Sequence, residues 1–125
     1  MKQPAISDAE WEVMNVVWAN SPVTASDIVE ALSDHTDWSP RTIKTMLNRL
    51  LKKGALSHEV DGKRYLYRPA ISREQGIEQA SETFLSRVFS GDEVPMLVHL
   101  VRNAELTPRQ IEKLREALQE KEEER

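Results

Sequence analysis

The residues best suited to bind another molecule are five cations in one stretch of the chain, Trp38 to Gly54, which reads WSPRTIKTMLNRLLKKG. No Asp or Glu occurs from Trp38 through His58, so the stretch contains no charge that could neutralise them. The five cations are Arg41, Lys44, Arg49, Lys52 and Lys53. Like charges at helical spacing repel one another, and an external polyanion would relieve that repulsion.

A single helix must position these cations, and both of its ends are encoded. Ser39 is a preferred N-cap residue, Pro40 suits the first helical position, and Gly54 can adopt the left-handed conformation after the last turn. At 100° per residue, one side of this helix is apolar and consists of Ile43, Met46, Leu47, Leu50 and Leu51. The opposite side gathers Arg41, Thr45, Asn48 and Lys52 within about 60°.

The polar side of this helix combines cations with Thr and Asn, which are side chains that can read base edges in DNA. We expect base contacts from Arg41, Lys44 and Asn48, because Arg or Lys pairs with guanine and Asn with adenine. Thr45 belongs to the same stripe. The residues expected to hold phosphates are Ser39, Thr42, Arg49, Lys52, Lys53, Lys63 and Arg64. The alternatives are a solvated face or a face for an acidic protein, but solvated helices usually mix charges of both signs.

Two helices are predicted before the basic one. The first is expected over residues 8–20, with Trp11 and Trp18 in its buried stripe, and the second over residues 24–34. Each begins at a capping box, formed by Ser7 with Glu10 and by Thr24 with Asp27. The break between them, Ser21-Pro22-Val23, is expected to contribute one short strand. Helix, turn and basic helix together form a helix-turn-helix.

A β-hairpin is predicted directly after the basic helix. Residues 56–60 and 64–68 read as strands joined by a type I′ turn at Asp61-Gly62. A hairpin in this position is a wing, and Lys63 and Arg64 at its tip could reach phosphates or a minor groove. The predicted fold class is therefore mainly α with a small β-hairpin, a winged helix-turn-helix DNA-binding domain over residues 1–70 followed by a helical dimerisation region over residues 71–125.

The carboxyl half contains more apolar surface than a small winged domain can cover. Three helices are expected, the first ending at Ser90-Gly91 and the others beginning near Asp92 and Thr107. Packing onto the DNA-binding domain is one way to bury this surface. A symmetric dimer explains it better, because two-fold association is the commonest oligomer. The predicted interface consists of Phe84, Leu85, Val88, Leu97, Leu100, Val101, Ile111, Leu114 and Leu118.

Composition restricts the classes of function that remain. The net charge of −4 conceals an asymmetry between two parts of the chain. Residues 41–68 carry eight Lys or Arg against two Asp or Glu, a local charge of +6, whereas residues 71–125 carry eight Lys or Arg against twelve Glu or Asp. The absence of cysteine excludes disulfides and thiolate metal sites, and we expect no cofactor and no bound metal. No apolar leader or membrane span is present, so a cytoplasmic protein without membrane contact is expected. The three histidines lie far apart, so an enzyme is not expected.

Three segments of the chain resemble the penicillinase and methicillin-resistance repressor family, the BlaI/MecI type. They are ISDAEWEVMNVVW at residues 6–18, DWSPRTIKTMLNRLLKKG at residues 37–54 and FLSRVFSG at residues 84–91. The resemblance implies a homodimeric winged-helix repressor on a palindromic double-stranded DNA operator. Its recognition helix would correspond to residues 39–53 and its dimer-forming region to residues 72–122.

The chain departs from this family in two places. The copper-responsive relatives carry a cysteine-rich carboxyl end, which is absent here, so thiolate copper sensing is excluded. In the antibiotic-resistance branch, the resemblance implies a sensor-linked protease as partner, cutting at an Asn-Phe pair. That pair corresponds to His99-Leu100, which makes these two residues the candidate cleavage region. Because both positions differ, the inducing signal does not follow from the resemblance.

Overall fold

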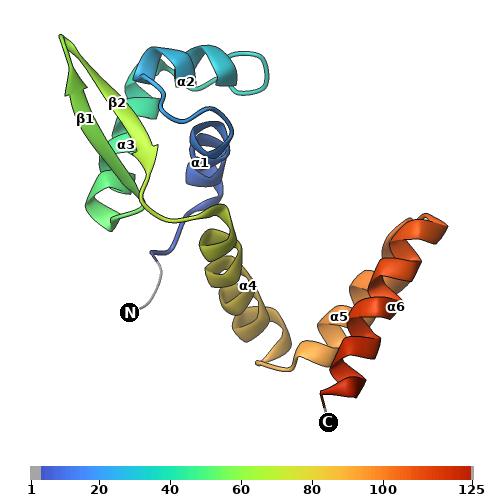
Figure 1. Cartoon of the computed structure of the whole chain (residues 1–125). Coiled ribbons are helices and arrows are strands. Elements are labelled where there is room, and N and C mark those ends of the chain that lie inside the picture. The colour runs from blue at the N-terminus through green and yellow to red at the C-terminus, as the bar shows by residue number, and fades with distance from the viewer. Residues whose placement is uncertain (1–3, 125) are drawn as a thin grey trace. The chain divides into compact units, whose positions relative to one another are not determined.

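The computed structural model describes residues 4–124 (Figure 1). The helices within this range are α1 (Asp8–Asn20), α2 (Ala25–Leu32), α3 (Pro40–Lys53), α4 (Arg73–Phe89), α5 (Glu93–Asn103) and α6 (Pro108–Glu123), and the strands are β1 (Leu56–Asp61) and β2 (Arg64–Pro69). The chain divides into two compact units between Phe84 and Leu85, inside α4. The predicted boundary after residue 70 separates a DNA-binding region from a dimerisation region, and it stays a prediction. The first compact unit extends beyond it and includes most of α4.

The amino-terminal helices begin where their caps predict. In α1 the Ser7 hydroxyl accepts a hydrogen bond from the Glu10 N–H at 3.2 Å, and the Glu10 carboxylate accepts one from the Ser7 N–H at 2.8 Å. Thr24 and Asp27 form the same reciprocal pair at the start of α2. Each capping box satisfies two N–H groups that a helix terminus otherwise leaves unpaired.

The basic helix α3 has both predicted ends. The Ser39 hydroxyl accepts from the Thr42 N–H at 3.2 Å, and Pro40 occupies the first helical position, where no N–H is needed. Gly54 then adopts the left-handed conformation, with φ of +82°. Between these ends, the helical spacing of the apolar residues determines which side of α3 is buried.

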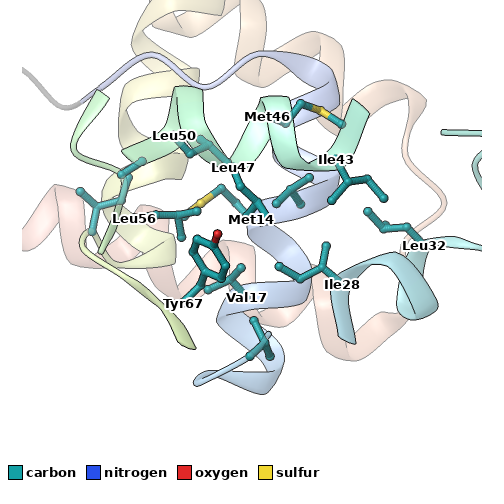
Figure 2. Packing of buried hydrophobic residues seen from close by; sticks show 14 residues of the cluster. Met14, Val17, Ile28, Leu32, Ile43, Met46, Leu47, Leu50, Leu56 and Tyr67 are labelled. Carbon is teal, nitrogen blue, oxygen red and sulfur yellow. The ribbon is translucent and has the colours of Figure 1, made fainter. Parts of the chain in front are cut away.

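The core of the first unit is formed by α1, α2, α3 and the hairpin. Figure 2 shows their apolar side chains converging on one another. The apolar side of α3 supplies Ile43, Met46, Leu47 and Leu50, each at most 4% exposed. Burial of such a side chain contributes about 1.5–3 kcal/mol. Packing of these four residues therefore holds the opposite, basic face of α3 toward solvent.

The hairpin is antiparallel and is joined to the helices by one additional bridge. Leu56 pairs with Pro69 at its base and Asp61 with Arg64 at its tip. Val23 forms an isolated bridge with Tyr67, in which Val23 N–H donates to Tyr67 O and Tyr67 N–H to Val23 O, at 3.1 and 2.7 Å. This bridge confirms the short extended segment predicted between α1 and α2, and it fixes the wing against the helix-turn-helix.

The predicted turn of the hairpin is wrong by one residue. Because Asp61 pairs with Arg64, the two central residues are Gly62 and Lys63 rather than Asp61 and Gly62. Only the first of them has a positive φ, +66° at Gly62, whereas a type I′ turn needs positive φ at both positions. Glycine at the first central position is typical of type II′, so Lys63 sits at the tip itself.

The prediction that Trp11 and Trp18 are core residues is confirmed only in part, because Trp18 packs against the core but neither indole is fully buried. Both side chains are partly buried, and their ring centroids lie 5.4 Å apart. They face Gly76 at the start of α4, and a methyl group there would lie 3.0 Å from Trp18. Their spacing fits the buried stripe of α1, but part of their cover comes from the start of α4 rather than from the core.

The second unit is helical and carries little burial of its own. Ser90 and Gly91 end α4 with φ of +52° and +85°, Asp92 caps α5, and Thr107 forms a capping box at α6. No side chain of α5 or α6, both of which lie wholly within the described range, is buried. This unit therefore exposes many of its large apolar side chains, among highly charged sequence. No helix in the described part of the chain is long and apolar enough to cross a membrane.

Candidate nucleic-acid interface

The outer face of α3 carries the predicted contact residues in solvent-exposed positions. The exposed residues on and before this helix are Ser39, Arg41, Thr42, Lys44, Thr45, Asn48, Arg49, Lys52 and Lys53. Among the described residues, Lys44, Asn48, Arg49 and Lys52 form no hydrogen bond or ion pair with the protein. Their polar groups are therefore available to a ligand.

The hydroxyl groups on this face are partly engaged with the helix. Ser39 Oγ lies 3.1 Å from Thr42 Oγ1 at the N-terminus of α3. Thr45 Oγ1 donates to the carbonyl oxygen of Arg41 at 3.0 Å, which uses its proton but leaves its lone pairs for a donor. Thr45 is thus suited to accept a hydrogen bond, for example from a base amino group, rather than to hold a phosphate oxygen.

An open groove of about 550 Å³ collects residues from three elements. Lys44 and Asn48 line it from α3, and Lys63 and Arg64 line it from the tip of the wing. Four residues that the sequence analysis selected from two separate segments thus share one concave surface. The start of α2 also lines this groove, with residues Thr24 to Asp27.

Sequence reasoning missed three contributors to this groove, which are Tyr65, Tyr67 and the first turn of α2. Tyr65 is 51% exposed, and the ring of His58 packs edge-on against it with centroids 4.6 Å apart. Alternation along β2 placed Tyr65 on the same side as Tyr67, but nothing in the sequence indicated that this side faces α3. The burial of Tyr67 in the core, at 6% exposed, shows that this side of β2 faces the helices.

One carboxylate also lies in the groove. A hydrogen bond from the backbone N–H of Thr24, assisted by the Thr24 hydroxyl and the nearby Arg64 charge, lowers the pKa of Asp27 below its ordinary value. Asp27 is therefore charged at neutral pH and attracts the cations at the wing tip. This carboxylate would also repel phosphates at the α2 end of the groove, which favours the α3 and wing side as the place where a polyanion lies.

Two wing arginines are held in surface ion pairs. Arg64 Nη2 lies 3.1 Å from Asp61 Oδ2, and Arg68 Nη2 lies 3.0 Å from Glu59 Oε1. The side chains of all four residues are half or more exposed. Exposed pairs of this kind contribute about 0–1 kcal/mol, so a phosphate could replace Asp61 as the partner of Arg64 at little cost.

Lys53 differs from the other cations of α3. Its ammonium donates to the carboxylate of Glu10 and to the carbonyl oxygen of Ala5, at 2.8 Å in the second case. Glu10 is only 2% exposed. Burial acts to raise the pKa of this carboxyl, but hydrogen bonds from Lys53 and Ser7 outweigh it and lower the pKa. Lys53 thus ties the end of α3 to the segment before α1 and neutralises a buried charge.

The predicted interface residues of the second half are mostly exposed. Leu97 and Leu118 are 55% and 65% exposed, and Leu85 is the half-buried exception. The exposed residues of the predicted set are Phe84, Val88, Leu97, Leu100, Val101, Ile111, Leu114 and Leu118. Val94 and Val98 are also exposed on α5, although the predicted set does not contain them.

The candidate cleavage pair lies inside a helix. His99 and Leu100 are exposed residues in the middle of α5, and Asn103 donates a hydrogen bond to the carbonyl oxygen of His99 at 2.8 Å. A helical peptide bond does not fit a protease cleft that binds extended chains, so cutting here would require this turn of α5 to unwind. In the described residues, no group of three or more His or acidic side chains is arranged to hold a metal ion.

Nearly the whole chain matches known repressors. The family model described as penicillinase repressor matches residues 6–120. The penicillinase repressor of Bacillus licheniformis is 41% identical over 119 residues, covering 95% of this chain and 93% of the relative. The methicillin resistance regulatory protein MecI of Staphylococcus aureus (strain N315) is 34% identical over 116 residues, covering 93% of this chain and 94% of the relative.

A solved structure matches the first unit. The solution structure of the Bacillus licheniformis BlaI monomeric form in complex with the blaP half-operator is 47% identical, with a TM-score of 0.53, and covers 59% of this chain and 90% of that one. The family model, the two relatives and the winged helix-turn-helix architecture all indicate the same family. This chain belongs to the penicillinase repressor family, whose members are DNA-binding transcriptional repressors and not enzymes.

Proposed function

We propose that this protein represses transcription as a homodimer that binds a palindromic operator, with α3 of each subunit in a major groove. The observation that carries this proposal is the exposed, acid-free face of α3, with Lys44 and Asn48 in one groove with Lys63 and Arg64 of the wing. The related BlaI monomer, solved with a half-operator, supports the view that one winged unit engages one half-site.

Within this proposal, the side chains divide into two roles. Arg41, Lys44 and Asn48 contact base edges, since they project from the exposed side of α3 and can form the paired hydrogen bonds that distinguish bases. Phosphates are held by Ser39, Thr42, Arg49, Lys52, Lys63 and Arg64. Lys53 is not included among these phosphate contacts, because its ammonium already donates hydrogen bonds to Glu10 and to the carbonyl oxygen of Ala5.

Dimerisation follows from the second unit, which has an exposed apolar surface and no buried side chain in α5 or α6. A second copy of the chain would cover this surface. When two half-sites are bound by one dimer, the second contact is intramolecular, and affinity rises by a factor on the order of 10² to 10⁴. Loss of the dimer, by cleavage in the second unit or by another route, would therefore release the operator.

Selection of bound sequences from a random DNA pool tests the proposal. We expect an inverted repeat whose half-sites lie about one helical turn, or a multiple of it, apart. Sedimentation of the protein at micromolar concentration should show a dimer. A monomer, or a pool with no enriched sequence, would refute the proposal. Binding to an acidic protein with indifference to DNA sequence would instead support the alternative of a protein-interaction module.

A further inference from the structure

Tyr65 brings a hydroxyl group without a partner to the groove between α3 and the wing. It lines this groove together with Lys44, Lys63 and Arg64, and the residue is 51% exposed. Within the described chain, the Tyr65 hydroxyl forms no hydrogen bond. A phenolic hydroxyl can donate one hydrogen bond and accept others. A ligand that enters the groove can therefore use it.

The ring of Tyr65 is restrained by two aromatic rings on the same face of the hairpin. The ring of His58 packs edge-on against it, with centroids 4.6 Å apart and planes at 72°. The ring of Tyr67, which belongs to the core, lies 6.4 Å away at 76°. Edge-to-face arrangements at such separations stabilise aromatic pairs. Because the Tyr65 ring is ordered before a ligand binds, its hydroxyl loses little conformational freedom in the complex.

The charges around Tyr65 favour an anion on the wing side of the groove. Lys44, Lys63 and Arg64 outnumber the one carboxylate that lines this groove, which belongs to Asp27. Asp27 lies in the first turn of α2, so repulsion of an anion is strongest at that end. Tyr65 follows Lys63 and Arg64 directly in the chain and lies with them on the wing. An anion drawn to these cations therefore comes close to the Tyr65 hydroxyl.

We propose that the Tyr65 hydroxyl donates a hydrogen bond to a phosphate oxygen of the operator, and that His58 positions the Tyr65 ring for this contact. The inference rests on the proposed function and adds a neutral contact to the cations of the wing. Tyrosine is one of the side chains that bind phosphates in protein–DNA complexes. A single hydroxyl does not form the paired hydrogen bonds that distinguish bases, which the side chains of α3 can form.

Tyr65→Phe tests the contact, because it removes the hydroxyl and keeps the ring. Ser57→Ala is the matched control, since alternation along β1 puts this exposed hydroxyl on the opposite face of the same hairpin. Each full-length protein is titrated, at several salt concentrations, with the inverted repeat selected from the random pool and with its single-base variants. Circular dichroism and urea denaturation confirm that each protein is folded.

We expect Tyr65→Phe to weaken binding about three- to tenfold per subunit, which is the effect of one lost hydrogen bond. The loss should be the same on every single-base variant of the repeat. The slope of log affinity against log salt should not change, because a neutral hydroxyl displaces no counterion. In contrast, Lys63→Ala should lower this slope by about one unit per subunit. Ser57→Ala should stay within about twofold of the unmodified protein.

Two variants of His58 test its positioning role. His58→Ala removes the edge-on ring and should weaken binding about two- to fivefold, whereas His58→Phe keeps a ring and should restore the affinity. In the Tyr65→Phe background, His58→Ala should cause no further loss, because the hydroxyl through which it acts is absent. Additive losses would instead show that His58 contacts DNA itself, and would overturn this part of the inference.

Unchanged affinity of folded Tyr65→Phe for the selected repeat would overturn the phosphate contact. A loss confined to one position of the repeat would also overturn it, because that result describes a contact with a base. If the unmodified protein binds the selected repeat no better than a random duplex, the proposed function itself fails. The unmodified protein thus tests the repressor, and its comparison with Tyr65→Phe tests the hydroxyl.

Discussion

Lys52 and Lys53 are adjacent residues of identical chemistry for which the structure indicates different roles. Lys52 is exposed and, within the described chain, has no hydrogen-bond or ion-pair partner, whereas Lys53 neutralises the buried carboxylate of Glu10. Replacing each by alanine should therefore produce different defects. Lys52→Ala should affect DNA binding with little effect on folding, and Lys53→Ala should do the reverse.

The magnitude for Lys53→Ala follows from the burial of its partner. Breaking a fully buried ion pair costs about 3–5 kcal/mol, because a charge is left without compensation. The Lys53 side chain is 35% exposed and Ser7 still donates to Glu10, so water and the cap offset part of this loss. We expect the free energy of unfolding to fall by about 1–3 kcal/mol. Lys52→Ala should stay within about 0.5 kcal/mol.

Two assays measure these effects independently. Urea denaturation gives the free energy of unfolding, and the dependence of operator affinity on salt concentration reports the number of phosphate contacts. Lys52→Ala should reduce the slope of log affinity against log salt by about one unit per subunit, whereas Lys53→Ala should leave it unchanged. The double variant Glu10→Gln/Lys53→Met should recover much of the lost stability, since it leaves no unpaired charge.

The reasoning would be refuted by one combination of results. Suppose that Lys53→Ala lowered the slope of log affinity against log salt as much as Lys52→Ala, while the free energy of unfolding stayed unchanged. Lys53 would then be a phosphate contact, and its hydrogen bond to Glu10 would not stabilise the fold.

Three further predictions test base reading, release and pH dependence. Asn48→Ala should cost about 1–3 kcal/mol at one operator position and relax the sequence preference there, as measured with single-base operator variants. Leu97, Leu100 and Leu114 changed together to Ala should lower full-operator affinity while half-site affinity is kept, and a variant that is still dimeric and fully bound would contradict this. The ionised carboxylate of Glu10 should stabilise the fold fully above its unfolded pKa of about 4.3, and this stabilisation should be lost as pH falls through its lowered folded pKa. The difference in unfolding free energy between the unmodified protein and Glu10→Gln should therefore shrink between pH 7 and pH 3, as urea denaturation at each pH would measure.

The limits of α3 could be predicted because they depend on neighbouring residues alone. Ser39, Pro40 and Gly54 act within one turn of their own positions, and the apolar face follows from the helical period once the start is known. The starts of α5 and α6 could be predicted for the same reason, whereas the short strand at Val23 was predicted without its distant partner, Tyr67. Local chemistry was therefore sufficient for most of the secondary structure.

The features that could not be predicted depend on partners distant in sequence. The partner of Lys53 is Glu10, 43 residues away, and Trp18 binds Ile71, 53 residues away. The hairpin turn was misplaced because both Asp61-Gly62 and Gly62-Lys63 put glycine at a central position, and only strand register separates them. The assignment of individual contacts with bases and phosphates stays a prediction, since DNA decides it.

No side chain of α5 or α6, both within the described residues, is buried, and this affects how the second unit folds in a cell. A segment that gains its hydrophobic burial only from another copy folds as it associates, so its stability depends on protein concentration. At low copy number, the carboxyl half should lose helix while the winged unit stays intact. Circular dichroism of a dilution series would detect this loss. If the protein acts as the proposed dimer, its abundance would determine the integrity of the last third of its own chain as well as the occupancy of its operator.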